Sequence, residues 1–139
     1  MTTYNTSGIK SRTRFIPILM RILLGLLFTV TGLNGFLNFL PMPTNAMPAG
    51  ALAFSSAMMA TGYLFKLVAA TQLLSGVLLV TGIFVPFALI LLAPVVVNIF
   101  AFHAFLDPSG MGIAIFVSVF EVLLAWIYRK SFAPLFKKL

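Results

Sequence analysis

The 139-residue sequence contains no cysteine, only two acidic residues, one histidine and one tryptophan. Without cysteine, the chain acting alone forms no disulfide, no thiolate nucleophile, no iron–sulfur cluster and no cysteine-ligated zinc site. One histidine and two carboxylates are also too few ligands for a typical metal site. We therefore expect the chain to bind no metal and no redox cofactor of its own.

Charge is scarce as well. Charged residues make up 8 % of the sequence and hydrophobic residues 61 %, against about a quarter and about half in soluble domains. A soluble fold of this size could not cover its surface with so few polar groups, and disorder requires low hydrophobicity. The composition predicts an integral membrane protein.

Two long windows have no charge at all, one between Arg21 and Lys66 and one between Lys66 and Asp107. A membrane span needs about 20 apolar residues, and proline and glycine mark the breaks between apolar runs. We predict an all-α bundle of four transmembrane helices, with a short interfacial helix at 49–60 between the first and second spans. The predicted spans are residues 15–40, 63–81, 84–106 and 111–128.

The basic residues gather at the two ends of the chain, in predicted tails at residues 1–14 and 129–139. This arrangement is typical of the positive-inside rule and of attraction to anionic headgroups, and it does not predict nucleic-acid binding. An even number of spans places both tails on one side, so we expect both to be cytoplasmic. The basic residues of the two tails are Lys10, Arg12, Arg14, Arg129, Lys130, Lys137 and Lys138.

Two ionisable residues fall inside the predicted spans near the cytoplasmic boundary. At 1.5 Å per residue, Arg21 lies roughly 7–8 Å and Glu121 roughly 12 Å from it. We predict an intramembrane ion pair between them, because each alone would be more costly to bury than the pair. Two alternatives stay open, in which Arg21 extends to the headgroups or the residues form a functional proton or headgroup site.

A second polar group falls in the outer half of the spans and consists of Asn34, Gln72, Asn98 and His103. One interpretation is interhelical hydrogen bonding, worth about 0.6 kcal/mol per bond. The other is a pocket for a lipid-soluble ligand, such as a quinone whose carbonyls accept hydrogen bonds. We predict that the four side chains converge on an outward-facing cavity, walled by Phe and Met and covered by the helix at 49–60.

The motifs of three spans resemble a known family. The first span reads RILLGLLFTVTGLNGF from Arg21, the second ends GVLLVTGIF from Gly76, and the third contains NIFAFHAFLDP from Asn98. In this order they resemble the DoxX family of small four-span bacterial membrane proteins, over residues 15–136. The resemblance implies a bacterial inner-membrane protein, and some relatives are subunits of quinol oxidase or thiosulfate–quinone oxidoreductase systems.

Within that resemblance the matching positions are Arg21, Asn98 and His103. Gln72 stands where relatives often carry Glu, which removes a carboxylate and weakens a proton-transfer role. We therefore expect a non-catalytic accessory protein, a subunit or a module binding a small lipophilic ligand (a quinone or a lipid), linked to membrane redox or envelope processes. Its expected partners are membrane lipids and either other proteins or a second copy of the chain.

Two alternatives remain. One is a quinone-linked oxidoreductase component that uses His103 and Glu121 for proton transfer and depends on a partner for electrons. The other is a small four-span transporter.

Overall fold

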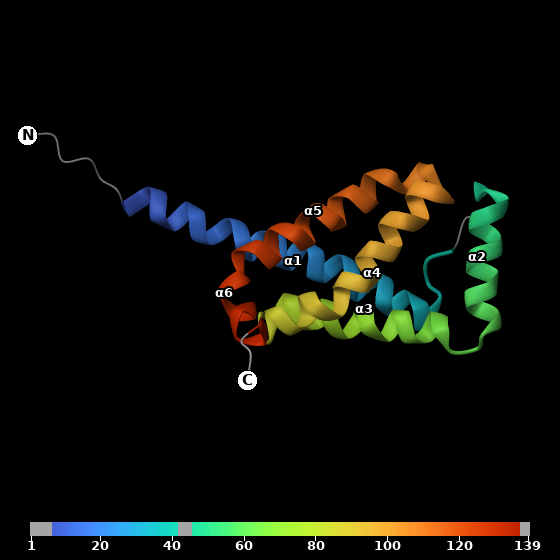
Figure 1. Cartoon of the computed structure of the whole chain (residues 1–139), viewed down its shortest axis with the longest axis horizontal. Helices are drawn as coiled ribbons and strands as arrows, with labels where there is room; N and C mark the ends of the chain where they lie inside the picture. The colour runs from blue at the N-terminus through green and yellow to red at the C-terminus, as the bar shows by residue number, and fades with distance from the viewer. Residues whose placement is uncertain (1–6, 42–45, 137–139) are drawn as a thin grey trace, which may run out of the picture.

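The structure is a computed structural model that describes residues 7–41 and 46–136, with side chains described for 14–41 and 46–135. In these residues the chain is helical and contains no strand (Figure 1). Its elements are α1 (Ser7–Leu37), α2 (Ala49–Ala60), α3 (Leu64–Thr81), α4 (Val85–Phe105), the 3-10 turn η2 (Pro108–Gly110), α5 (Met111–Ile127), α6 (Arg129–Phe132) and the 3-10 turn η3 (Ala133–Phe136).

Four helices of the described chain are long and apolar enough to cross a membrane. These segments cover Arg14–Leu37, Leu64–Thr81, Val85–Phe105 and Pro108–Ile127. The predicted all-α class, with four spans and a shorter helix between the first two, is confirmed. The first span differs from the prediction at both ends, because α1 already begins at Ser7 and ends at Leu37. Lysine and arginine are good helix formers, so a basic stretch can extend a membrane helix beyond its apolar part.

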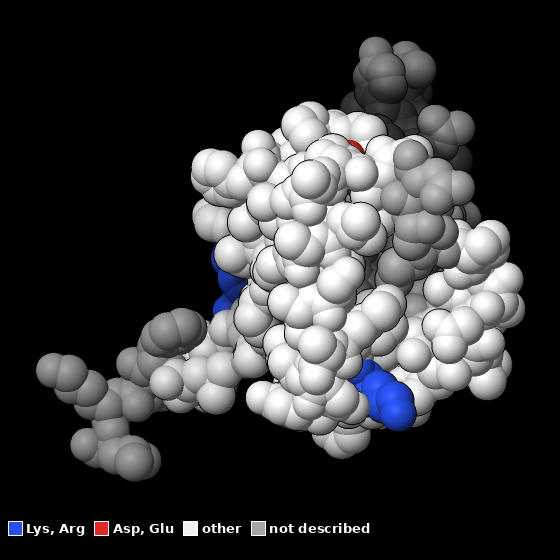
Figure 2. Space-filling model, turned by 90° about the vertical axis from the view of Figure 1, so that its right-hand side faces the viewer, with Lys and Arg blue, Asp and Glu red and all other residues white. Residues whose placement is uncertain are grey.

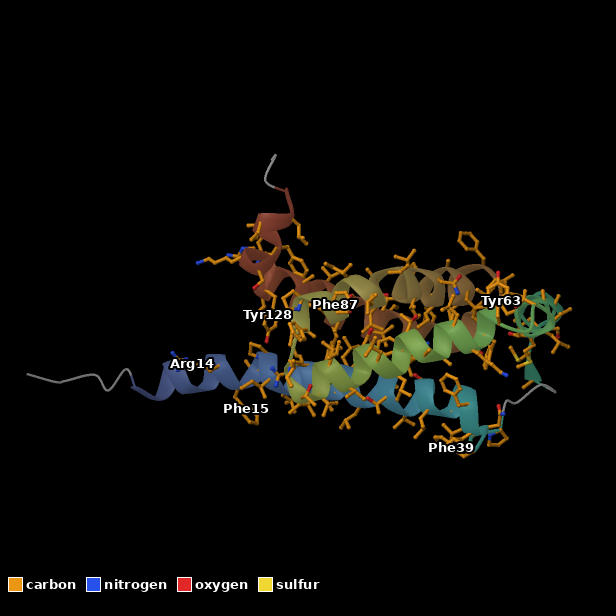
Figure 3. All side chains as sticks on the ribbon, turned by 90° about the horizontal axis from the view of Figure 1, so that it is seen from below. Arg14, Phe15, Phe39, Tyr63, Phe87 and Tyr128 are labelled. Atoms are coloured by element: carbon orange, nitrogen blue, oxygen red, sulfur yellow. The ribbon has the colours of Figure 1, made fainter. Side chains whose placement is uncertain are left out.

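The four long helices run alternately up and down, and α2 lies across one end of the bundle (Figure 1). The start of α1 and the C-terminal helix α6 lie at the opposite end. Tyrosines lie at both ends, with Tyr63 near α2 and Tyr128 near α6 (Figure 3). Tyrosine and tryptophan favour the two membrane–water interfaces, and the positions of these two tyrosines at opposite ends of the bundle fit that preference.

The closest helix–helix contact joins α1 to α3 through glycines. A Cβ placed on Gly76 of α3 would lie 2.5 Å from the backbone nitrogen of Thr29, and one on Gly25 of α1 would lie 2.9 Å from the Gly76 carbonyl oxygen. A Cβ on Gly32 would overlap the backbone of Leu73. In lipid, helices associate through close packing rather than hydrophobic burial, and small residues allow it.

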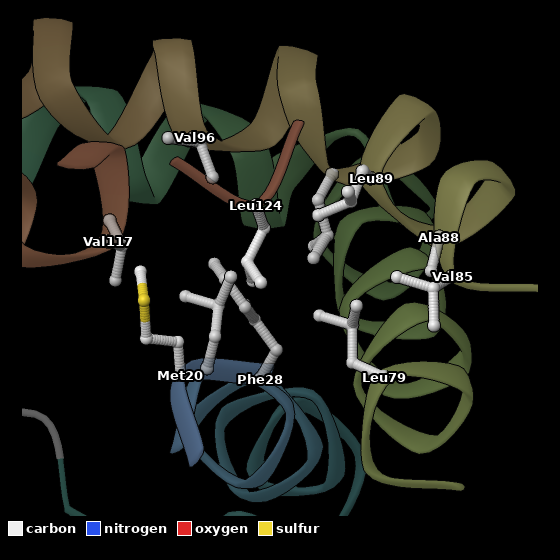
Figure 4. Close-up of a cluster of buried hydrophobic side chains, with 11 residues drawn as sticks. Met20, Phe28, Leu79, Val85, Ala88, Leu89, Val96, Val117 and Leu124 are labelled. Atoms are coloured by element: carbon white, nitrogen blue, oxygen red, sulfur yellow. The ribbon is translucent and has the colours of Figure 1, made fainter. Parts of the chain in front are cut away.

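A compact apolar cluster fills the centre of the bundle (Figure 4). Its largest buried side chains come from all four long helices and include Leu24, Phe28, Leu79, Leu92 and Leu124. The outer faces also carry many exposed large apolar side chains. Because lipid is the solvent for these faces, their exposure indicates contact with acyl chains.

Candidate ligand-binding groove

A groove of about 630 Å³ lies between α3 and α4. We call it the amide groove, because Gln72 of α3 and Asn98 of α4 are among its lining residues. Phe54 and Met58 of α2 also line it, so the short helix contributes to its wall at the α2 end of the bundle. The other residues that line it are Leu64, Leu67, Val68, Thr71, Ile90, Leu91, Pro94, Val95 and Ile99.

The two amides are the groove's principal unused hydrogen-bonding groups. Gln72 is half-buried and Asn98 is exposed, and both side chains line the groove. Within the described part of the chain, the side-chain hydrogen bonds include those of Thr71 and His103 but none of Gln72 or Asn98. Each amide offers two N–H donors and a carbonyl acceptor. In apolar surroundings such groups gain free energy when a ligand supplies the missing partner.

Two further polar groups of the groove are the Thr71 hydroxyl and a backbone carbonyl that Pro94 leaves without its usual helix donor. The Thr71 hydroxyl donates to the Leu67 carbonyl oxygen at 3.0 Å and is therefore already engaged. Pro94 lies inside α4 and has no N–H to donate to the carbonyl of Ile90, one turn earlier. Both residues line the groove. This backbone carbonyl was not identified from the sequence, although the proline within the predicted third span indicates it.

The structure places Asn34 and His103 outside the amide groove. The Asn34 side chain bonds to the backbone of Leu40, accepting from its N–H at 2.6 Å and donating to its carbonyl at 3.4 Å. It thereby satisfies backbone groups just after α1, where a helix end lacks partners. Of the four residues predicted to converge, the structure brings together Gln72 and Asn98 only.

His103 has a similar local role after α4. Its Nδ1 lies 2.8 Å from the backbone carbonyl oxygen of Asp107, and its ring packs edge-on against Phe102 with centroids 5.1 Å apart. A Cβ on Gly110 would overlap the imidazole. The histidine thus holds the connection between α4 and α5.

Arg21 and Glu121 do not form the predicted ion pair in the described part of the chain. The Arg21 guanidinium lies against Gly82, where a Cβ would be 2.6 Å from Nη1, and its Nε is buried without a hydrogen-bond partner. The close approach of α1 and α3 directs Arg21 to the C-terminal end of α3, which favours a cation. Glu121 is buried on α5, and its Oε2 also has no partner.

The fold and the groove define a four-span α-helical membrane protein with an apolar, amide-bearing cleft. The DoxX family model matches residues 16–104, more than half of the chain, so the protein belongs to the DoxX family. The match runs from α1 through α4 and includes both amides. Searches of curated proteins and of solved structures give no match.

Proposed function

We propose that the protein is a membrane accessory protein that binds a small carbonyl-bearing lipophilic ligand, a quinone or a lipid, in the amide groove. The observation that carries the proposal is the pair of amides, Gln72 and Asn98, which make no side-chain hydrogen bond to another described residue and lie in a mainly apolar groove of about 630 Å³. Ligand pockets of roughly 300–1,000 Å³ with apolar walls and a few polar groups are typical of small-molecule sites. A quinone fits this chemistry, since its flat ring contacts apolar walls and its carbonyls accept hydrogen bonds from amide N–H groups.

A role without catalysis follows from where the acid–base groups lie. His103 is engaged with the Asp107 carbonyl beyond the end of α4, whereas Glu121 lies within α5. Neither residue lines the amide groove. This placement supports a subunit or ligand-binding module in membrane redox or envelope processes over an oxidoreductase component that transfers protons through these two residues.

The proposal is tested with the protein in lipid nanodiscs and decylubiquinone as the probe. Replacing either amide with an apolar side chain of similar size, in Gln72→Met or Asn98→Leu, should weaken binding by about tenfold, the equivalent of one lost hydrogen bond of about 1.4 kcal/mol. Thr71→Val is the matched control, because the Thr71 hydroxyl is already bonded to Leu67. Wild-type affinity in both amide variants would contradict the proposal.

We also propose that the protein resides in the bacterial inner membrane with both ends in the cytoplasm. Arg14 and Arg129 lie toward the end of the bundle that holds α6, and both are exposed. The α2 end, which faces the viewer in Figure 2, is mostly uncharged but shows blue patches, and Lys66 is exposed in the first turn of α3 on that side. Basic residues accumulate on the cytoplasmic side. A cytoplasm-active reporter should therefore work when fused to the C-terminus and fail when inserted between α1 and α2, and the reverse pattern would overturn the orientation.

A further inference from the structure

A second groove, of about 540 Å³, lies between α4, α5 and the C-terminal segment. We call it the carboxyl groove, because Glu121 is one of its lining residues. Its walls include Ala93 and Val97 of α4, Ala125 of α5 and Phe132 of α6. Ile90 lines both grooves, so the two cavities lie on neighbouring faces of α4.

The Glu121 side chain is buried, and one of its carboxyl oxygens has no hydrogen-bond partner. The residue is 6 % exposed, and the oxygen without a partner is Oε2. The nearby Ser118 hydroxyl donates to the Ala114 carbonyl oxygen at 2.7 Å, so its proton is not offered to Glu121. A carboxyl in an apolar environment without a partner costs several kcal/mol. Such an exception in a folded protein requires an explanation.

Arg21 and Arg129, the arginines nearest to Glu121 in the predicted depth along the spans, do not line the carboxyl groove. Arg21 packs against Gly82 at the end of α3. Arg129 lies over the Trp126 ring, 4.8 Å from its centroid, and donates to the Trp126 carbonyl oxygen at 3.0 Å. Among the described residues that line the carboxyl groove there is no lysine and no arginine. The groove therefore combines apolar walls with a single acidic group.

We propose that the carboxyl groove is a binding site for a lipophilic amine in its ammonium form. The apolar walls receive the hydrocarbon part, and the Glu121 carboxylate accepts charge-assisted hydrogen bonds from the ammonium. A phospholipid headgroup fits less well, because its phosphate would find no cation among the described residues that line the groove and would lose hydration without compensation. A neutral alcohol would gain a weaker, uncharged hydrogen bond. The proposal is independent of the function assigned to the amide groove.

The test compares three probes of equal chain length at neutral pH: dodecylamine, dodecanol and dodecanoic acid. Each is equilibrated by dialysis against protein-containing nanodiscs, and the uptake by empty nanodiscs of the same lipids is subtracted. We expect the wild-type protein to retain dodecylamine at least about tenfold more tightly than either other probe. Glu121→Gln should abolish this preference, and because glutamine has nearly the same shape as glutamate the variant should still fold.

Two further variants separate a site from a nonspecific effect. Ala93→Phe fills the groove from an exposed position and keeps the carboxyl, so it should also abolish the preference for the amine. Gln72→Met, in the other groove, should leave it unchanged. Equal retention of dodecanol and dodecylamine by the wild type would show an apolar groove only, and persistence of the preference in Glu121→Gln would equally overturn the proposal.

Discussion

The two grooves on neighbouring faces of α4 differ far more in their polar groups than in their walls. Their volumes are about 630 and 540 Å³, and both are lined mainly by aliphatic side chains. The amide groove offers neutral donors and acceptors, whereas the carboxyl groove offers one acidic group. Where lipid and wall are equally apolar, burial of a hydrocarbon chain discriminates little between ligands. Selectivity then depends on the one or two polar side chains that need a partner.

The grooves also differ in their relation to the family. Both amides, and every described residue that lines the amide groove, lie within the matched residues 16–104. The carboxyl groove depends on α5 and on the C-terminal segment, which lie beyond the match. The amide groove is therefore built entirely by the part of the chain that the family model describes, and the carboxyl groove is not.

The largest loss of stability is expected at the contact between α1 and α3. Of the two grooves, only the amide groove is lined by α3. In Gly32→Ala the new Cβ would overlap the Leu73 backbone, so the free energy of unfolding should fall by about 2–3 kcal/mol. Thermal unfolding in detergent measures the loss. Because α3 does not line the carboxyl groove, decylubiquinone binding should weaken more than dodecylamine binding.

Gly112→Ala provides the matched control for this change. A Cβ on Gly112 meets nothing within 4 Å, and alanine is the better helix former by about 1 kcal/mol. The variant should therefore be as stable as the wild type or slightly more stable. Equal melting temperatures for Gly32→Ala and Gly112→Ala would show that close backbone packing does not hold α1 against α3.

A smaller loss of stability is expected when His103 is replaced, and this change tests whether the histidine belongs to the amide groove. His103→Ala removes the hydrogen bond to the Asp107 carbonyl and the ring contact with Phe102. Stability should fall by about 1 kcal/mol, while decylubiquinone affinity stays at the wild-type value. A loss of affinity without a loss of stability would place the histidine in the ligand site instead.

The smallest effect concerns the coupling between Arg21 and Glu121. Because the two side chains are not paired, the stability changes of Arg21→Leu and Glu121→Leu should add in the double variant to within about 0.5 kcal/mol. Thermal unfolding of the three variants and the wild type completes the cycle. A coupling above about 1 kcal/mol would mean that the carboxyl of Glu121 has a cationic partner, and the case for an amine site would then fail.

The spans could be predicted from the sequence because they depend only on the order of residues along the chain. Long stretches without charge, interrupted by proline and glycine, determine where a chain can cross lipid. The short helix at 49–60 was also recognisable, since it is too short to span and is bounded by breaks. The beginning of α1 was not, because lysine and arginine are compatible with both a helix and an unstructured tail.

The composition of the site was harder to predict because it depends on rotation about each helix axis. Depth along the spans placed Asn34, Gln72, Asn98 and His103 in the same half of the predicted bundle, but depth says nothing about the direction of a side chain. A helix that is apolar on every face has no polar stripe from which its orientation can be inferred. The same limit applies to Arg21 and Glu121, which lie at comparable depth and face different neighbours.

The most direct test of two separate, chemically distinct grooves measures both ligands on the same proteins. Decylubiquinone and dodecylamine are titrated, singly and together, into nanodiscs containing the wild type, Gln72→Met or Glu121→Gln. We predict that both ligands bind the wild type at once, that Gln72→Met loses only the quinone, and that Glu121→Gln loses only the amine. Mutual displacement in the wild type, or loss of both ligands in either variant, would contradict the account.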